Sequence, residues 1–102
     1  MAYEIEWAES AIADLLEAIE YFAKDSPSYA ASLVVRAEAA AASLADLPHR
    51  GRLVREYRDP NVRELIVSSY RLIYRVSAAT VSVISFVHTA RDLPAFVNRA
   101  DP

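Results

Sequence analysis

Three segments rich in Val, Ile, Tyr and Thr follow one another closely in the second half of the chain, at residues 62–68, 70–77 and 80–88. Such residues favour β-strands. Short Ser or Ala links at 68–69 and 78–79 separate the segments, and links of two residues join antiparallel strands. The pattern therefore predicts a three-stranded antiparallel meander.

The tight links also assign side chains to the two faces of this meander, with Leu65 opposite Leu72 and Tyr74 opposite Val83. One face is apolar, as expected of a core: Leu65, Val67, Tyr70, Leu72, Tyr74, Val76, Val81, Val83 and Val87. The other face is mixed: Glu64, Ile66, Arg71, Ile73, Arg75, Ser82, Ile84, Phe86 and His88. We therefore expect the first face to be covered by other elements.

The first half of the chain supplies that cover. Alternating apolar residues at 3–7 predict a strand, and apolar residues at helical spacing then predict a helix from Ser10 to about Lys24: Ile12, Leu15, Leu16, Ile19 and Phe22. Ser26 and Pro27 suit the N-cap and first turn of a second helix. Its apolar seam, before the stop at Pro48, consists of Leu33, Ala37, Ala40, Leu44 and Leu47.

The short break between the two helices predicts an antiparallel helical hairpin that packs on one face of the sheet. The expected fold is one α+β domain over residues 1–102, in the order β-α-α-β-β-β. After about residue 93 we expect a short helix or an extended tail.

Composition excludes several classes of site. The chain has no cysteine, and its two histidines lack the spacing of metal ligands, so we expect neither a metal nor another cofactor. Its apolar runs fall far short of the ~20 residues that span a bilayer. The N-terminus does not resemble a signal peptide. These features predict a cytoplasmic protein that does not contact membranes.

Charge is unevenly distributed along the chain, whose net charge is −3. Residues 1–48 carry two cations and nine anions, whereas residues 49–102 carry nine arginines and five anions. Arginine suits bidentate recognition of carboxylate or phosphate, although a genome rich in G and C would also favour arginine and alanine. The sheet half is therefore expected to present a basic surface.

The mixed face of the sheet is the expected partner-binding surface, because an apolar patch with charged edges is typical of protein interaction sites. The alternative is that the tail folds back over the patch. The expected binding residues are Ile66, Arg71, Ile73, Arg75, Ile84, Phe86, His88, Arg91 and Phe96.

Metal-independent RNA cleavage is the enzymatic alternative that the composition leaves open. It requires a base for the 2′-hydroxyl, a cation for the phosphorane and an acid for the leaving oxygen. The candidates are Arg63, Arg71, His88 and Arg91. Arg71 could equally pair with Glu64 across the sheet, and a lone histidine at a strand end is usually structural or solvated.

Five motifs follow one another along the chain: Ile12-x-x-Leu15-x-x-x-Ile19-x-Tyr21, Gly51-Arg52-Leu53-Val54, Val62-Arg63-Glu64-Leu65-Ile66-Val67, Tyr70-Arg71-Leu72-Ile73-Tyr74-Arg75-Val76 and Val87-His88-Thr89-Ala90-Arg91. In this order they resemble the RelE/ParE superfamily of bacterial type II toxins, over about residues 3–93. The resemblance implies a plasmid-stabilisation type of toxin that forms a hetero-oligomer with an antitoxin, whose C-terminal segment binds it. Operator DNA would be contacted only through the antitoxin.

Members of the superfamily either inhibit DNA gyrase, as ParE-like toxins do, or cut ribosome-bound mRNA, as RelE-like toxins do. RelE-like nucleases usually have a tyrosine near the C-terminus, where this chain has Phe96, and no tyrosine follows Tyr74. The sequence pI of about 5.3 is also poorly suited to the phosphate-rich ribosome. The resemblance thus favours a ParE-like gyrase inhibitor that acts by protein binding. The alternatives are an mRNA endoribonuclease, or a degenerate toxin that only binds its antitoxin and regulates the operon.

Overall fold

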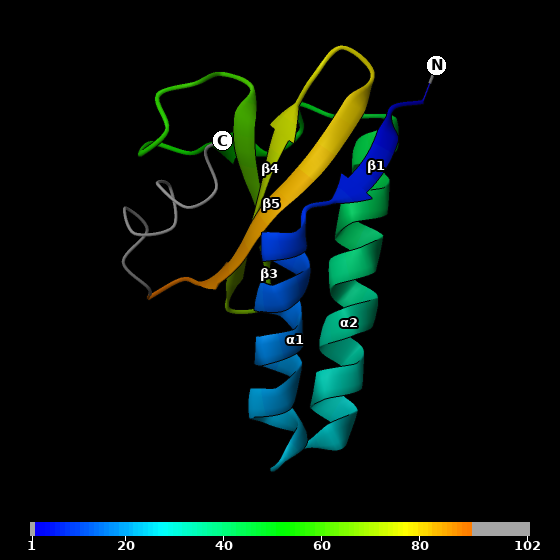
Figure 1. The fold of residues 1–102 in the computed structure, drawn as a ribbon, viewed down its shortest axis with the longest axis vertical. Helices are drawn as coiled ribbons and strands as arrows, with labels where there is room; N and C mark the ends of the chain where they lie inside the picture. The colour runs from blue at the N-terminus through cyan, green and yellow to red at the C-terminus, as the bar shows by residue number, and fades with distance from the viewer. Residues whose placement is uncertain (1, 91–102) are drawn as a thin grey trace.

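The computed structural model describes residues 2–90 as two helices beside one mixed sheet (Figure 1). The sheet order is β1-β5-β4-β3-β2. The elements along the chain are β1 (Glu4–Trp7), α1 (Glu9–Ala23), α2 (Pro27–Ala42), a 3-10 turn (Ser43–Ala45), β2 (Arg52–Leu53), β3 (Val62–Val67), β4 (Tyr70–Val76) and β5 (Thr80–His88). The predicted α+β fold is confirmed.

The meander β3-β4-β5 has the predicted antiparallel pairing, including Leu65 opposite Leu72 and Tyr74 opposite Val83. β1 lies parallel to β5 at one edge. At the other edge the two-residue β2 pairs antiparallel with β3, a strand that the sequence analysis did not predict. The sheet therefore has five strands, of which four were predicted.

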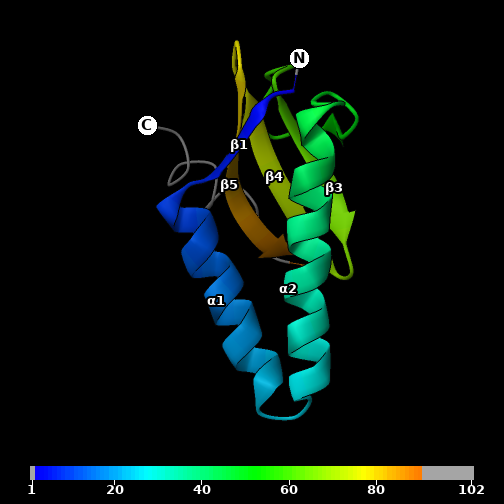
Figure 2. The ribbon, with the colours of Figure 1, turned by 90° about the vertical axis from the view of Figure 1, so that its right-hand side faces the viewer.

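The two helices form the predicted antiparallel hairpin on one face of the sheet, and their joined end projects past the strands (Figure 2). Ser26 is the N-cap of α2 and accepts a hydrogen bond from the amide of Tyr29 at 3.3 Å. Pro27 occupies the first helical position, where its missing N–H leaves no hydrogen bond unmade.

The buried face of α1 differs from the prediction. Its fully buried residues are Ala11 and Ala18, whereas Ile12 and Leu16 are 45% and 55% exposed. Small side chains let α1 approach α2 and β5 closely, while Leu15 and Phe22 are partly buried against the core, as predicted. On the segment after α2, Leu47 is also exposed, contrary to the predicted seam.

The end of β5 also differs from the prediction, because the β4–β5 register shifts between Ile73 and Tyr74. Ile73 pairs with Ser85 while Tyr74 pairs with Val83, so Ile84 is an extra residue in β5. A bulge of this kind reverses the alternation of the residues that follow it. Phe86 and His88 therefore lie on the helix side of the sheet, and Val87 lies on the opposite side.

The face away from the helices is covered, contrary to the expected exposed patch. Ile73 and Ile84 are buried there in a second core, which contains Val54, Val62, Ile73, Ile84 and Val87 and against which Tyr57 packs. Val54 and Tyr57 belong to the segment between β2 and β3. This segment was missing from the prediction, which considered only the C-terminal tail as a cover. Ile66 remains exposed.

Two polar side chains of α1 bind the edge of β5 where β1 ends. Ser10 donates to the carbonyl of Ile84 at 2.8 Å, and Asp14 accepts from the amide of Phe86 at 3.0 Å. Their spacing of four residues puts both on one side of the helix. These bonds satisfy backbone groups beyond β1 and fix α1 against the end of β5.

Tyr74 connects the centre of the sheet to the loop that follows the helices. Its buried hydroxyl accepts a hydrogen bond from the amide of Gly51 at 2.9 Å. Burial raises the pKa of Tyr74, and this effect outweighs the opposing influence of the Gly51 amide and of Arg63 and Arg50. A Cβ on Gly51 would lie 2.6 Å from the Glu64 carbonyl oxygen, so the backbones need glycine here to approach this closely.

Within residues 2–90, neither helix combines the length and apolar character that a bilayer span requires.

We expect Tyr74→Phe to lower the free energy of unfolding by about 1–3 kcal/mol, because it leaves the buried Gly51 amide without its acceptor. Urea denaturation measures this loss. Tyr21→Phe is the matched control, since Tyr21 is 72% exposed, and it should change stability by less than about 0.5 kcal/mol. Equal effects of the two substitutions would contradict the role assigned to Tyr74.

The raised pKa of Tyr74 also predicts a pH dependence. The unfolded chain releases this proton near pH 10.0 and the folded chain at a higher pH, so the stabilising effect is complete below pH 10 and declines above it. The stability difference between wild type and Tyr74→Phe should therefore shrink by up to about 1.4 kcal/mol per pH unit above pH 10. Urea denaturation at pH 8 and pH 10.5 tests this expectation, and a difference that stays constant would refute it.

Candidate functional site

Glu64 is the centre of an ion-pair network on the sheet face opposite the helices. Its carboxylate is 3% exposed and binds Arg52 at 2.5 Å and Arg71 at 2.6 Å. Arg71 also lies 3.4 Å from Glu56, in the segment between β2 and β3. Leaving such a buried charge without its partners would cost about 3–5 kcal/mol, so these arginines stabilise the fold.

The neighbouring arginines hold the same segment to the sheet. Arg75 pairs with Asp59 at 3.2 Å and lies over the ring of Tyr57, 6.0 Å from its centroid. Arg63 donates to backbone carbonyls of three loop residues, at 3.1–3.2 Å: His49, Gly51 and Pro60. Of the arginines in the predicted basic half, Arg52, Arg71 and Arg75 are therefore paired with carboxylates.

A shallow cleft of about 390 Å³ lies beside this network, lined by Arg52, Leu53, Arg55, Glu56, Glu64, Arg71 and Thr89. The structure places Arg71 in it. Arg63 instead binds the loop, and His88 lies on the other side of the sheet. Arg91 and Phe96, which were also predicted to be site residues, lie outside the described residues.

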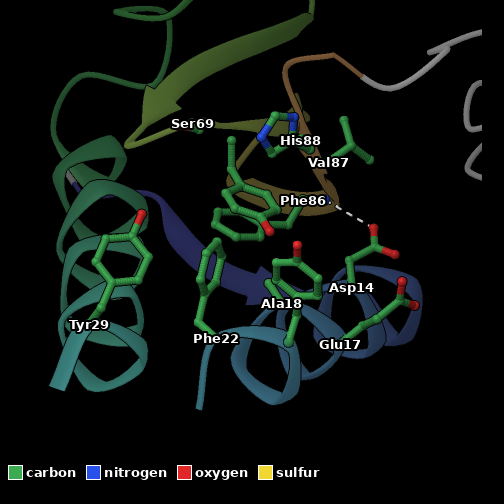
Figure 3. Close-up of a pocket in the computed structure, with 11 residues that line it drawn as sticks. Asp14, Glu17, Ala18, Phe22, Tyr29, Ser69, Phe86, Val87 and His88 are labelled. Carbon is green, nitrogen blue, oxygen red and sulfur yellow. Dashed lines mark hydrogen bonds between the residues drawn. The ribbon is translucent and has the colours of Figure 1, made fainter. Parts of the chain in front are cut away.

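A larger pocket of about 610 Å³ lies on the helix side, where α1, the start of α2, the start of β4 and the end of β5 meet (Figure 3). Its lining combines aromatic rings with two carboxylates and a histidine: Asp14, Glu17, Ala18, Tyr21, Phe22, Tyr29, Ser69, Tyr70, Phe86, Val87 and His88. Of the predicted binding residues it contains Phe86 and His88. The sequence analysis missed the pocket, because the bulge in β5 turns both residues towards α1.

The aromatic rings of the pocket pack against one another. Tyr70 and Phe86 stack with their centroids 4.8 Å apart, and Phe22 meets Tyr29 edge to face at 4.7 Å. His88 contacts Tyr70 edge to face at 5.4 Å. The Tyr29 hydroxyl also hydrogen-bonds Ser68 in the β3–β4 turn at 2.5 Å. These contacts give the pocket a preformed wall.

The helical hairpin carries a further surface feature, an apolar stripe on α1 made of Ile12 and Leu16, which are 45% and 55% exposed. Ile12 and Leu16 are four residues apart and lie on one side of α1. Exposed side chains of this size are typical of sites that contact a partner protein.

Among residues 2–90, no three His, Cys, Asp or Glu side chains gather in a way that could hold a metal ion.

Comparison with known proteins identifies relatives of the whole fold. Residues 5–93 match the family model described as the ParE toxin of the type II toxin-antitoxin system, parDE. Toxin RelE2 of Caulobacter vibrioides is 35% identical over 89 residues, which cover 86% of this chain and 97% of that protein.

Solved structures share the fold. The chromosomal ParDE system of P. aeruginosa contains a chain with a TM-score of 0.70 and 19% identity, with 85% of this chain and 96% of that chain covered. The toxin-antitoxin complex RelBE2 of Mycobacterium tuberculosis matches with a TM-score of 0.59 and 26% identity, over 89% of this chain and 95% of that chain. A mutant of the E. coli toxin RelE matches with a TM-score of 0.63 and 21% identity, over 98% of this chain and 95% of that chain.

The family-model match covers nearly the whole described chain, and the two-helix, five-stranded architecture agrees with it. This chain therefore belongs to the ParE toxin family of type II toxin–antitoxin systems, within the RelE/ParE superfamily.

Proposed function

We propose that this protein is a plasmid-stabilisation type of toxin that inhibits DNA gyrase by binding it, and that a cognate antitoxin neutralises it. The observation that carries the proposal is that two candidate nuclease arginines, Arg63 and Arg71, make their bonds within the fold. Arg63 binds loop carbonyls and Arg71 binds Glu64 and Glu56, so both contribute to the fold. A toxin that acts by protein contact does not need them for chemistry.

The relative positions of the candidate nuclease residues also support protein binding. In the β4–β5 pairing His88 lies opposite Tyr70 while Arg71 lies opposite Val87, so Arg71 and His88 are on different faces of the sheet. A general acid and a cation that stabilises the phosphorane must both reach one phosphate. This arrangement therefore disfavours the nuclease mechanism that requires Arg71 and His88 together.

The antitoxin is proposed to bind through an amphipathic C-terminal segment that orders on the toxin. The structures of ParDE and RelBE2 concern toxin-antitoxin systems, which supports a partner of this kind. The apolar stripe on the helical hairpin offers it a surface, and Ile66 and Arg75 remain accessible on the sheet. The complex is a hetero-oligomer that contacts operator DNA through the antitoxin.

Ribosome-dependent mRNA cleavage is the second candidate, and the 35% identity to a protein named Toxin RelE2 favours it. In that case Arg63, Arg71, His88 and Arg91 remain the candidate residues. A degenerate toxin that only binds its antitoxin is a third possibility, for which overexpression would be harmless.

The purified chain is expected to inhibit supercoiling by DNA gyrase and to leave protein synthesis in a cell extract unchanged. Plasmid supercoiling on agarose gels and reporter translation in the extract measure the two activities side by side. Full gyrase activity at saturating toxin would refute the proposal. Cleavage of the mRNA by the wild-type toxin, together with intact mRNA when Arg91→Ala is added instead, would establish the second candidate.

Leu16→Asp is expected to weaken binding of the antitoxin at least tenfold, because it places a charge in the apolar stripe. Titration calorimetry with the protein encoded beside this gene measures the affinity. Ala78→Asp is the matched control, since it adds the same charge at an exposed position in the β4–β5 turn, outside α1. Equal affinities of the two variants would exclude the stripe from the interface.

A further inference from the structure

The segment that joins the helices to the central strands concentrates positive charge. Residues 49–63 hold five arginines and two acidic residues, a net charge of +3 in a chain whose net charge is −3. Three of these arginines, Arg50, Arg55 and Arg58, are exposed. Within residues 2–90 their side chains form no ion pair and no hydrogen bond. We call these three residues the basic loop surface.

The two loops that carry this surface are fastened to each other. The side chain of Arg63 donates to the carbonyl of Gly51 at 3.1 Å and to the carbonyl of Pro60 at 3.1 Å. Arg50 directly precedes the first of these residues, and Arg58 lies two positions before the second. The loops lie at the end of the molecule opposite the tip of the helical hairpin (Figures 1 and 2). A surface fixed in this way has less conformational freedom to lose when it binds a ligand.

Arg58 has a backbone conformation that arginine seldom adopts. Its φ is 52°, in the left-handed region that favours glycine and asparagine. Because the side chain is exposed, packing inside the fold does not explain an arginine at this position. Residues in such conformations are frequent at sites that bind ligands. A ligand for the guanidinium group would account for this residue.

We propose that the basic loop surface binds the phosphate backbone of the DNA that gyrase holds. Planar guanidinium groups bind phosphate oxygens in pairs, and contacts of this kind supply much of the affinity of proteins for DNA. Such contacts also position a protein on a duplex without reading its sequence. The inference rests on the proposed inhibition of gyrase and adds a second contact to it.

The composition of the surface favours DNA over a protein as its ligand. Protein interfaces usually centre on apolar or aromatic side chains. The exposed side chains at positions 55–61 include no large apolar one: Arg55, Glu56, Arg58, Pro60 and Asn61. The residues outside 49–63 together carry a net charge of −6, which repels phosphate. The field of the protein would therefore orient this end towards DNA.

Fluorescence anisotropy of the labelled full chain, titrated with gyrase in the presence and absence of a linear DNA duplex, tests the proposal. DNA is expected to raise the affinity of the wild-type toxin for gyrase at least tenfold. Arg50→Ala/Arg58→Ala should lose this gain and bind DNA-free gyrase as the wild type does. Without two phosphate contacts, the slope of log affinity against log salt concentration should fall by about 2.

Lys24→Ala/Arg36→Ala is the matched control, since it removes two positive charges from exposed positions of the helical hairpin. This variant should keep the gain in affinity that DNA provides. Arg50→Lys/Arg58→Lys retains both charges and should keep most of the salt dependence.

The outcomes separate this inference from the proposed function. A toxin that binds gyrase equally well with and without DNA would overturn the inference and leave gyrase inhibition standing, as would equal behaviour of the two alanine double variants. A toxin that does not bind gyrase in either condition would refute the proposed function and the inference with it. Weaker binding of Arg50→Ala/Arg58→Ala to purified ribosomes, with gyrase binding unchanged, would assign the surface to RNA and also overturn the inference.

Discussion

The extra residue in β5 determines where the side chains at the end of the sheet point. Because Ile84 has no partner opposite it in β4, Phe86 turns towards the helices and Val87 turns away from them. Phe86 then stacks on Tyr70 in the main core, while Ile84 and Val87 join the second core. Without this bulge neither the aromatic floor of the pocket nor the second core would have its present composition.

Much of the fold follows from local patterns in the sequence. The links at 68–69 and 78–79 correctly predict the meander and the pairing near each turn, and Ser26-Pro27 correctly predicts the start of α2. The bulge has no comparable signal, since Ile84 is as suitable for a regular strand as its neighbours. For that reason the assignment of faces fails only beyond it, at Phe86, Val87 and His88.

The candidate site was harder to predict because exposure depends on contacts between distant segments. The sequence shows that Ile73 and Ile84 share a mixed face, but whether that face is open depends on Val54 and Tyr57, which lie 19 and 27 residues away from Ile73 and Ile84 respectively. Arg71 and Glu64 were identified as a possible pair. That Glu64 is almost fully buried and shared with Arg52 becomes evident only when β2 is in place.

The uneven charge of the sequence corresponds to two surfaces with different roles. The carboxylates of the first half include Asp14 and Glu17, which line the pocket of about 610 Å³. Three arginines of the second half, Arg52, Arg71 and Arg75, pair with Glu56, Asp59 and Glu64, so these three hold β2 and the segment after it to the sheet. Since these charges are already paired within the fold, the three arginines are less available to a partner than unpaired charges would be.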